Sequence, residues 1–208
     1  MLILLVAFSY LLGSIPVGYI LTRILKRVDI RRCGSGNPGA TNVFRVVNPG
    51  AGVTALALDM LKGIIPVTAF ADFLLHSQGG LDQITVRLIL AIAAVCGHNW
   101  TIFLNFKGGK GVATSAGVLV GLSFKIPDLG LIVGLCLGVW LLVLLTTGYV
   151  SLSSIITVSA LPIFMLVFNQ PFKLVIFAAA LCLFVVYRHK SNIRRLLRGE
   201  EGRIFRQS

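Results

Sequence analysis

The chain has 208 residues, of which 56% are hydrophobic and only 12% are charged, and its mean hydropathy is +0.92. A soluble domain of this length could not bury so much apolar surface, so the composition excludes a soluble globular protein. The formal net charge is +12. Basic residues beside apolar segments are more typical of membrane topology and anionic lipid headgroups than of nucleic-acid binding, so we expect no nucleic-acid partner.

Seven apolar segments follow one another along the chain, and a transmembrane helix needs roughly 20 mostly apolar residues. They are residues 1–22, 50–75, 84–96, 112–124, 129–146, 152–168 and 172–187. A Gly-Ser-Ile-Pro sequence predicts a kink in the first, which we expect to be a retained span rather than a signal peptide. The short third and fourth segments are typical of half-spans near a polar site. The sequence therefore predicts an all-α, polytopic membrane protein of about seven helices, forming a single integral membrane domain over residues 1–208.

Basic residues gather after the first, third and seventh of these segments. They are Arg23, Lys26, Arg27, Arg31, Arg32, Arg45, Lys107, Lys110, Arg188, Lys190, Arg194, Arg195, Arg198, Arg203 and Arg206. The intervening segment 76–83 has no Lys or Arg, and segments 123–128 and 169–173 have one lysine each. The positive-inside rule then predicts an N-terminus outside and a cytoplasmic C-terminus, which an odd number of spans allows.

The first polar segment is residues 34–45, with the sequence GSGNPGATNVFR. Asn37 is a good N-cap and Pro38 a good first helical residue, so a short helix is predicted to begin there. The sequence Asn-Pro-Gly at 48–50 is expected to stop it. Thr41 and Arg45 lie four residues apart and would share one face of this helix.

This segment has the composition of an anion site. Ser35 and Gly36 precede the predicted helix, where free amide groups and the helix dipole favour an anion, and Arg45 adds a guanidinium that matches phosphate oxygens. A re-entrant loop with glycines for close packing is the alternative. The glycines also match G-x-G-x-x-G, but no strand precedes them, so we exclude a dinucleotide-binding fold.

The second polar segment, residues 97–114, contains two lysines and three glycines in the run 107–111. Such a run predicts a cationic nest of amide groups. It fails the P-loop pattern, because Leu104 stands where the pattern needs glycine and Gly111 where it needs serine or threonine. A flexible, positively charged turn is the alternative. His98 and Asn99 are expected either to cap a helix end or to reach a ligand.

The third polar segment is residues 186–201. His189 and Asn192 lie three residues apart, Arg195 or Leu196 continues the same helical stripe, and Gly199 is placed as a C-terminal stop. A basic helix lying on anionic lipid would explain the arginines. It would not explain His189 and Asn192, which add nothing to lipid attraction at neutral pH.

The topology places all three polar segments on one face of the membrane. Ser151, in the turn after the fifth apolar segment, comes out on the same face. We therefore expect one site that collects arginine, lysine, amide and hydroxyl donors for one or two phosphate groups beside a lipid-filled groove. Cysteine and histidine spacings match no metal motif, so no metal or cofactor is expected.

Taken together, these segments resemble the three signature segments of the bacterial acyl-phosphate:glycerol-3-phosphate acyltransferase family. The matching positions are Ser35 to Asn37, Gly39 to Asn42, Arg45, Gly97, His98, Phe106 to Thr114, His189, Asn192, Arg195, Leu196, Gly199 and Glu201. They occur in the family's order, and the resemblance covers essentially the whole chain. One departure is Thr101, where the family commonly has proline, and we expect a looser turn there without loss of a ligand.

The resemblance implies a seven-helix enzyme of the bacterial cytoplasmic (inner) membrane with its active site facing the cytoplasm. It would transfer a fatty acyl group from acyl phosphate to the sn-1 hydroxyl of glycerol 3-phosphate, giving lysophosphatidate and phosphate, the first step of phospholipid synthesis. Its partners would be these two substrates and membrane lipid. The catalytic candidates are Ser35, Arg45, His189 and Asn192. The substrate-binding candidates are Gly36, Asn37, Thr41, Asn42, Lys107, Gly108, Gly109, Lys110, Gly111 and Ser151. Glu201 is expected to be structural.

Two mechanisms remain open for such an enzyme. An acyl phosphate is already activated, so the protein mainly has to align the hydroxyl and stabilise negative charge. In the first mechanism a substrate phosphate takes the proton and Ser35 donates a hydrogen bond. In the second, Ser35 is a covalent nucleophile assisted by His189.

The competing function is transport of phosphate or an organophosphate. A transporter predicts charged residues near the middle of the bilayer and polar clusters reachable from both sides. Asp59 and Lys62, three residues apart in the second apolar segment, are the only such pair, and a salt bridge accounts for them. A purely structural lipid-binding scaffold would leave Ser35, His189 and Asn192 without a task.

Overall fold

The structure is a computed structural model that describes residues 1–205, and this part of the chain is helical with no strand, which confirms the all-α prediction. Arg206, one of the predicted cytoplasmic charges, lies outside the described residues. The chain packs as two compact units, one spanning Met1–Lys125 and one beginning at Ile126. The single domain over residues 1–208 stays a prediction.

Five helical stretches are long and apolar enough to cross a membrane. They are Leu2–Lys26, Pro49–Ser77, Gln83–Leu104, Leu129–Thr147 and Val150–Val167. Phe172–Arg188 and Lys190–Leu197, bent by 59° from each other, make a sixth if they count as one span, and Val112–Ser123 is a shorter apolar helix. The chain is a membrane protein, whereas the count of seven spans and the orientation stay predictions.

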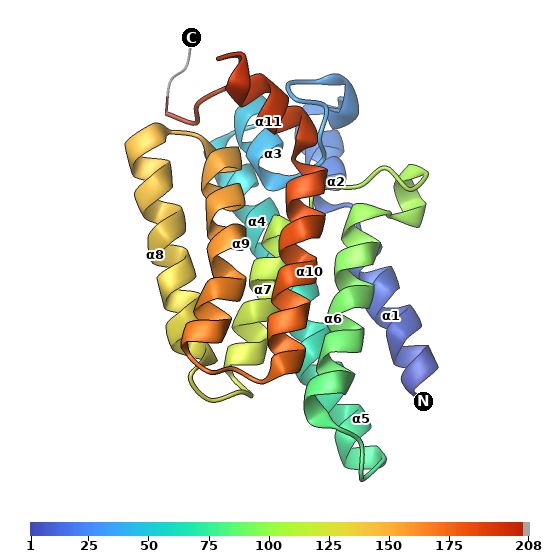
Figure 1. The fold of residues 1–208 in the computed structure, drawn as a ribbon. Helices are drawn as coiled ribbons and strands as arrows, with labels where there is room; N and C mark the ends of the chain where they lie inside the picture. Colours follow the sequence, from blue (N-terminus) through green and yellow to red (C-terminus); the bar gives the residue numbers. More distant parts are fainter. Residues whose placement is uncertain (206–208) are drawn as a thin grey trace. The chain divides into compact units, whose positions relative to one another are not determined.

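The first unit contains most of the short elements and breaks. Its elements are α1 (Leu2–Ser14), α2 (Val17–Lys26), the 3₁₀ turn η1 (Ile30–Arg32), α3 (Ala40–Val46), α4 (Pro49–Ile65), the π-helical turn η2 (Pro66–Phe70), α5 (Ala71–Ser77), α6 (Gln83–Asn99), the 3₁₀ turn η3 (Ile102–Leu104) and α7 (Val112–Ser123). Helix α1 packs along α6, and α4 packs along α7 (Figure 1). The predicted kink lies between α1 and α2, because Pro16 has no N–H to continue the helix.

Small residues let the helices of this unit approach closely. A Cβ at Gly63 would lie 2.1 Å from the Thr114 carbonyl oxygen, and one at Gly117 would lie 2.0 Å from that of Met60. Backbones in contact replace bulky side chains along the α4–α7 pair, which is the usual way to associate helices in lipid. The unit can thus hold α4 and its polar residues close to the neighbouring helices.

The second unit is a row of longer helices. It contains α8 (Leu129–Thr147), α9 (Val150–Val167), α10 (Phe172–Arg188) and α11 (Lys190–Leu197), with α9 packed against both α8 and α10 (Figure 1). Helix α8 ends at Gly148, whose φ of 76° is left-handed. Gly199 ends α11 with φ of 68°, which confirms the predicted helix stop.

Candidate active site

The loop before α3 is fixed by one buried amide side chain. The Oδ1 atom of Asn42 accepts from the Ser35 N–H at 3.0 Å, and its Nδ2 donates to the carbonyls of Cys33 at 3.0 Å and Ile30 at 3.5 Å. Asn42 is only 2% exposed. The residue predicted as a substrate ligand therefore has another task in this structure, which is to hold the backbone at Ser35.

The helix after this loop begins later than predicted. Helix α3 starts at Ala40 with Gly39 as N-cap, and the Asn37 side chain accepts from the Gly39 N–H at 2.9 Å instead of capping a helix that starts at Pro38. The amide groups of Ser35 and Gly36 are not free either: the second donates to the Cys33 carbonyl at 3.0 Å. The prediction of free amides here is wrong, because the loop folds back on itself and uses them.

The sequence Asn-Pro-Gly that was expected to stop this helix begins the next one. Helix α3 ends at Val46, and the Asn48 side chain accepts from the Ala51 N–H at 2.8 Å as the N-cap of α4, with Pro49 in its first turn. The signals for a helix stop and a helix start coincide here, because proline ends one helix and suits the first turn of the next.

The other side chains of this segment that the sequence predicted for the site are Ser35, Thr41 and Arg45. Ser35 and Arg45 are exposed and Thr41 is half-buried. Thr41 and Arg45 lie four residues apart on α3, as predicted. Asn42 lies on the same short helix, so the bond that pins Ser35 also ties its position to the helix that carries Arg45.

Ahead of the loop that precedes α3, Asp29 fixes the turn η1. Its Oδ1 accepts from the Arg31 N–H at 3.0 Å, and its Oδ2 pairs with the Arg31 guanidinium at 2.7 Å. Hydrogen bonding to that guanidinium lowers the pKa of Asp29 to about 2. Arg31 in turn lies over the ring of Tyr19, 5.3 Å from its centroid. This part of the basic loop has its own counter-ion.

The glycine run of the second segment folds against the end of α6. The Gly108 N–H donates to the Asn99 carbonyl and the Gly109 N–H to the His98 carbonyl, both at 3.1 Å. A Cβ at Gly108 would lie 2.1 Å from the His98 carbonyl oxygen. These two amide groups do not form the predicted nest; close packing explains the glycines. Lys107, exposed, and Lys110, half-buried, remain as the cationic part of the segment.

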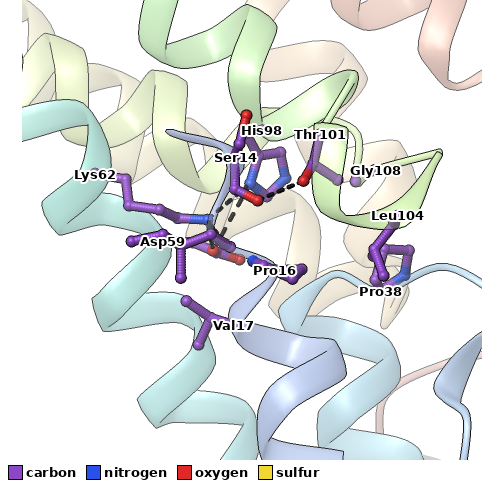
Figure 2. A pocket seen from close by; sticks show the side chains of 12 residues that line it. Ser14, Pro16, Val17, Pro38, Asp59, Lys62, His98, Thr101, Leu104 and Gly108 are labelled. Atoms are coloured by element: carbon purple, nitrogen blue, oxygen red, sulfur yellow. Dashed lines mark hydrogen bonds and ion pairs between the residues drawn. The ribbon is translucent and has the colours of Figure 1, made fainter. Parts of the chain in front are cut away.

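Under this glycine run lies a small cavity lined by a buried ion pair. Lys62 Nζ is 2.6 Å from Asp59 Oδ1, which confirms the salt bridge predicted for the second apolar segment, and 3.4 Å from His98 Nδ1. Figure 2 shows the three side chains converging, with Pro38 and Gly108 also on the lining. At about 10 Å³ the cavity has roughly the room of one water.

Thr101 anchors the turn that follows α6. Its hydroxyl donates to the Ser14 carbonyl at 2.5 Å and accepts from the Phe103 N–H at 3.2 Å. The residue is 2% exposed. The expectation of a looser turn at this departure from the family pattern is therefore wrong, because the hydroxyl supplies a bond to the break between α1 and α2 that a proline could not.

In the second unit, the carboxylate of Glu201 is the centre of the third segment. Its Oε1 accepts from Ser151 Oγ at 2.8 Å and from Asn192 Nδ2 at 2.6 Å, and its Oε2 pairs with Arg195 Nε at 2.7 Å. Burial would raise the pKa of Glu201, but the bonds from Asn192, Ser151 and Arg195 outweigh it and lower the pKa. The sequence predicted Ser151 and Asn192 as separate candidates and missed that one carboxylate joins them.

His189 lies at the bend between α10 and α11. It is 3% exposed, and its Nδ1 is 2.8 Å from the Val185 carbonyl oxygen, which can only accept, so Nδ1 carries a proton. The predicted continuous stripe from His189 to Arg195 is interrupted here, since α11 begins at Lys190. His189 is thus both the C-cap of α10 and the N-cap of α11, and Asn192 lies on α11.

Comparisons with known proteins place the chain in a family. A family model described as glycerol-3-phosphate acyltransferase matches residues 3–199. The chain belongs to this family. A glycerol-3-phosphate acyltransferase of Desulforudis audaxviator is 43% identical over 97% of this chain and 94% of its own length. One of Trichormus variabilis is 43% identical over 96% of this chain and 90% of its own length.

Two solved structures of the family share the fold. They are crystal structures of PlsY (YgiH), an integral membrane glycerol 3-phosphate acyltransferase, in its glycerol 3-phosphate and lysophosphatidic acid forms. Each is 39% identical to this chain and covers 97% of it and 94% of its own length, with TM-scores of 0.84 and 0.82. Family membership decides between the two predicted function classes: the chain is a membrane acyltransferase of this family, not a transporter.

Proposed function

We propose that this protein transfers a fatty acyl group from acyl phosphate to the sn-1 hydroxyl of glycerol 3-phosphate. The observation that carries the proposal is its likeness, over 97% of its length, to an acyltransferase solved in glycerol 3-phosphate and lysophosphatidic acid forms. The hydroxyl oxygen attacks the acyl carbon, the bond from that carbon to the phosphate oxygen breaks, and inorganic phosphate leaves. The hydroxyl proton passes to a phosphate oxygen, so that lysophosphatidate and phosphate are the products.

The groups that this chain offers support acyl phosphate as the donor, which the family likeness suggests. The polar segments supply donors and cations in Ser35, Arg45 and Lys107, whereas the carboxylate of Glu201 is already occupied by three donors and its pKa is lowered. Such a set stabilises negative charge but contains no carboxylate suited to act as a base. An activated donor that brings its own phosphate base fits it best.

In this proposal Arg45 and Lys107 bind phosphate oxygens, and Ser35 donates a hydrogen bond to the reacting phosphate. His189 and Asn192 complete the catalytic set. The neighbouring Gly36, Asn37 and Thr41, the run 108–111 and Ser151 shape the site. Membrane lipid surrounds the acyl chain, and the site faces the cytoplasm from the bacterial inner membrane.

The proposal is tested with purified protein given glycerol 3-phosphate and, in parallel, acyl phosphate, acyl-CoA or acyl carrier protein. Of the three donors, we expect only acyl phosphate to give lysophosphatidate, with a stoichiometric amount of phosphate. Arg45→Lys keeps the charge but loses the two-pronged contact, so its turnover should fall by about tenfold or more. Efficient transfer from acyl-CoA in place of acyl phosphate would refute the donor assignment.

The covalent alternative has a separate test. Wild-type protein incubated with acyl phosphate alone should keep its intact mass and still form product once glycerol 3-phosphate is added. A mass raised by one acyl group, mapping to Ser35, would instead establish the serine nucleophile.

The orientation is tested by single cysteines in a cysteine-free background. The structure makes Gly108 a poor position, because a Cβ there meets the His98 carbonyl, and exposed Phe106 replaces it. Cysteines at Phe106 and Ser191 should react with a membrane-impermeant thiol reagent only from the cytoplasmic side, and one at Ser77 only from outside. Labelling at Phe106 and Ser191 from opposite sides would exclude a single site.

A further inference from the structure

The break between α1 and α2 leaves carbonyl groups that need donors. In a continuous helix the Gly13 carbonyl would accept from the Val17 N–H, but that N–H donates to the Ile15 carbonyl at 3.0 Å. Unsatisfied carbonyls are costly in an apolar environment, so other groups must supply the bonds. Lys62 Nζ does so, at 3.3 Å from the Gly13 oxygen and 2.8 Å from the Ile15 oxygen.

Lys62 also contacts the ring of His98. An ammonium group has only donors, so the contact between Nζ and His98 Nδ1 at 3.4 Å is attractive when Nδ1 carries a lone pair. Asp59 Oδ1 lies 3.7 Å from Nδ1, beyond a hydrogen bond.

The other side of this ring faces the glycine run. A Cβ built at Gly109 would lie 2.1 Å from His98 Nε2, so the ring packs directly on the Gly109 backbone. The backbone of the same histidine holds the run as well, since its carbonyl accepts from the Gly109 N–H at 3.1 Å. Lys62 thus touches the helix break on one side and, through His98, the segment that carries Lys107 on the other.

We propose that Lys62, held by Asp59, is a positioning residue for the acyltransferase reaction. It joins the break between α1 and α2 to the segment 107–111 and so sets the place of the phosphate-binding Lys107. This inference rests on the proposed function of that segment. Lys62 itself is 4% exposed and acts through His98 rather than on a substrate.

A second buried cation in the same unit offers a control for stability alone. Arg87 is 3% exposed, pairs with Asp72 at 2.6 Å and donates to the Val67 carbonyl in the π-helical turn η2 at 2.5 Å. Like Lys62, it combines a carboxylate with a backbone carbonyl at a helix irregularity. Within residues 1–205, its bonds to Val67 and Asp72 do not lead to the segment 107–111.

The test compares two double variants that each remove a buried cation together with its carboxylate, so that no buried charge is left alone. Lys125, which also pairs with Asp72 at 2.6 Å, is partly exposed. Asp59→Asn/Lys62→Met removes the proposed positioning pair, and Asp72→Asn/Arg87→Met removes the control pair. The measurements on each are the melting temperature, the Kd for glycerol 3-phosphate by calorimetry, and kcat and KM with acyl phosphate.

Both double variants should melt at lower temperature than wild type. Only Asp59→Asn/Lys62→Met should bind glycerol 3-phosphate more weakly, with Kd and KM raised about tenfold or more and kcat less affected, since a shifted segment misplaces its cation. An unchanged Kd in this variant, or an equal rise in the control, would overturn the inference. The Kd for glycerol 3-phosphate can be measured without turnover. A wild-type protein that binds glycerol 3-phosphate but does not use acyl phosphate would therefore refute the donor assignment. The Kd values of the two double variants would still decide the role of Lys62.

Discussion

The polar segments of the two units are organised by different kinds of side chain. In the first unit Asn42, a neutral amide, holds the backbone around Ser35, reaching carbonyls no further away along the chain than Ile30. In the second unit the charged Glu201 joins Ser151, Asn192 and Arg195 across a much longer stretch of sequence. The neutral Asn42 thus orders one loop through nearby backbone groups. The charged Glu201 connects the start of α9 to α11, and its bonds depend on its ionisation.

The largest loss of stability should follow from removing the Glu201 carboxylate. Glu201→Ala leaves three donors without their acceptor, including the Arg195 guanidinium, so the free energy of unfolding should fall by about 3–5 kcal/mol. The melting temperature of detergent-solubilised protein measures this, with the exposed neighbour variant Glu200→Ala as a control. Equal losses in the two variants would mean that Glu201 is not the centre of this segment.

A smaller loss is expected from Asn42→Asp in the first unit. The carboxylate keeps an acceptor for the Ser35 N–H but turns an oxygen toward the Cys33 and Ile30 carbonyls, which should cost about 2–3 kcal/mol of unfolding free energy. Asn37→Asp is the matched control, because its bond uses only an oxygen acceptor for the Gly39 N–H. If both variants melt alike, the Nδ2 bonds of Asn42 do not hold the loop.

The contributions of Glu201 and Asn42 to stability should also differ in their dependence on pH. The folded protein holds the pKa of Glu201 below its ordinary value, so the unfolded chain binds the proton first as pH falls. The stability difference between wild type and Glu201→Gln should be constant above the ordinary glutamate pKa of about 4.3 and shrink as pH falls through the lower folded pKa. The difference between wild type and Asn42→Ala should stay constant over the same range. Thermal melts across pH test both, and a shrinking Asn42→Ala difference would contradict the comparison.

The smallest effect is expected from Cys33→Ala. Asn42 and Gly36 use the Cys33 carbonyl, which any residue supplies, so stability should change by less than about 0.5 kcal/mol and most turnover should remain. Melting and initial-rate measurements check this. A loss of turnover as large as that of Ser35→Ala would point to a thioester route through this thiol.

The sequence by itself determined the features that depend on composition and on local chemistry. Apolar segments predict membrane helices wherever they stand, Pro16 breaks a helix because it lacks an N–H, and Gly199 ends one because it tolerates a left-handed backbone. The paired charges at Asp59 and Lys62 likewise predicted their own salt bridge, since three residues apart on a helix brings them together. The three polar segments were enough to indicate the family.

Only the tertiary structure decided what each polar group binds. The amide groups of Gly108 and Gly109 could have formed an anion nest, but the carbonyls at the end of α6 lie within reach and accept from them first. Thr101 was expected to loosen a turn. In the structure, the break after α1 places the Ser14 carbonyl beside the Thr101 hydroxyl, which donates to it. Glu201 gained its role from donors far away in the sequence. A hydrogen bond is satisfied by whichever partner the fold brings to within about 3 Å, and no local pattern contains that information.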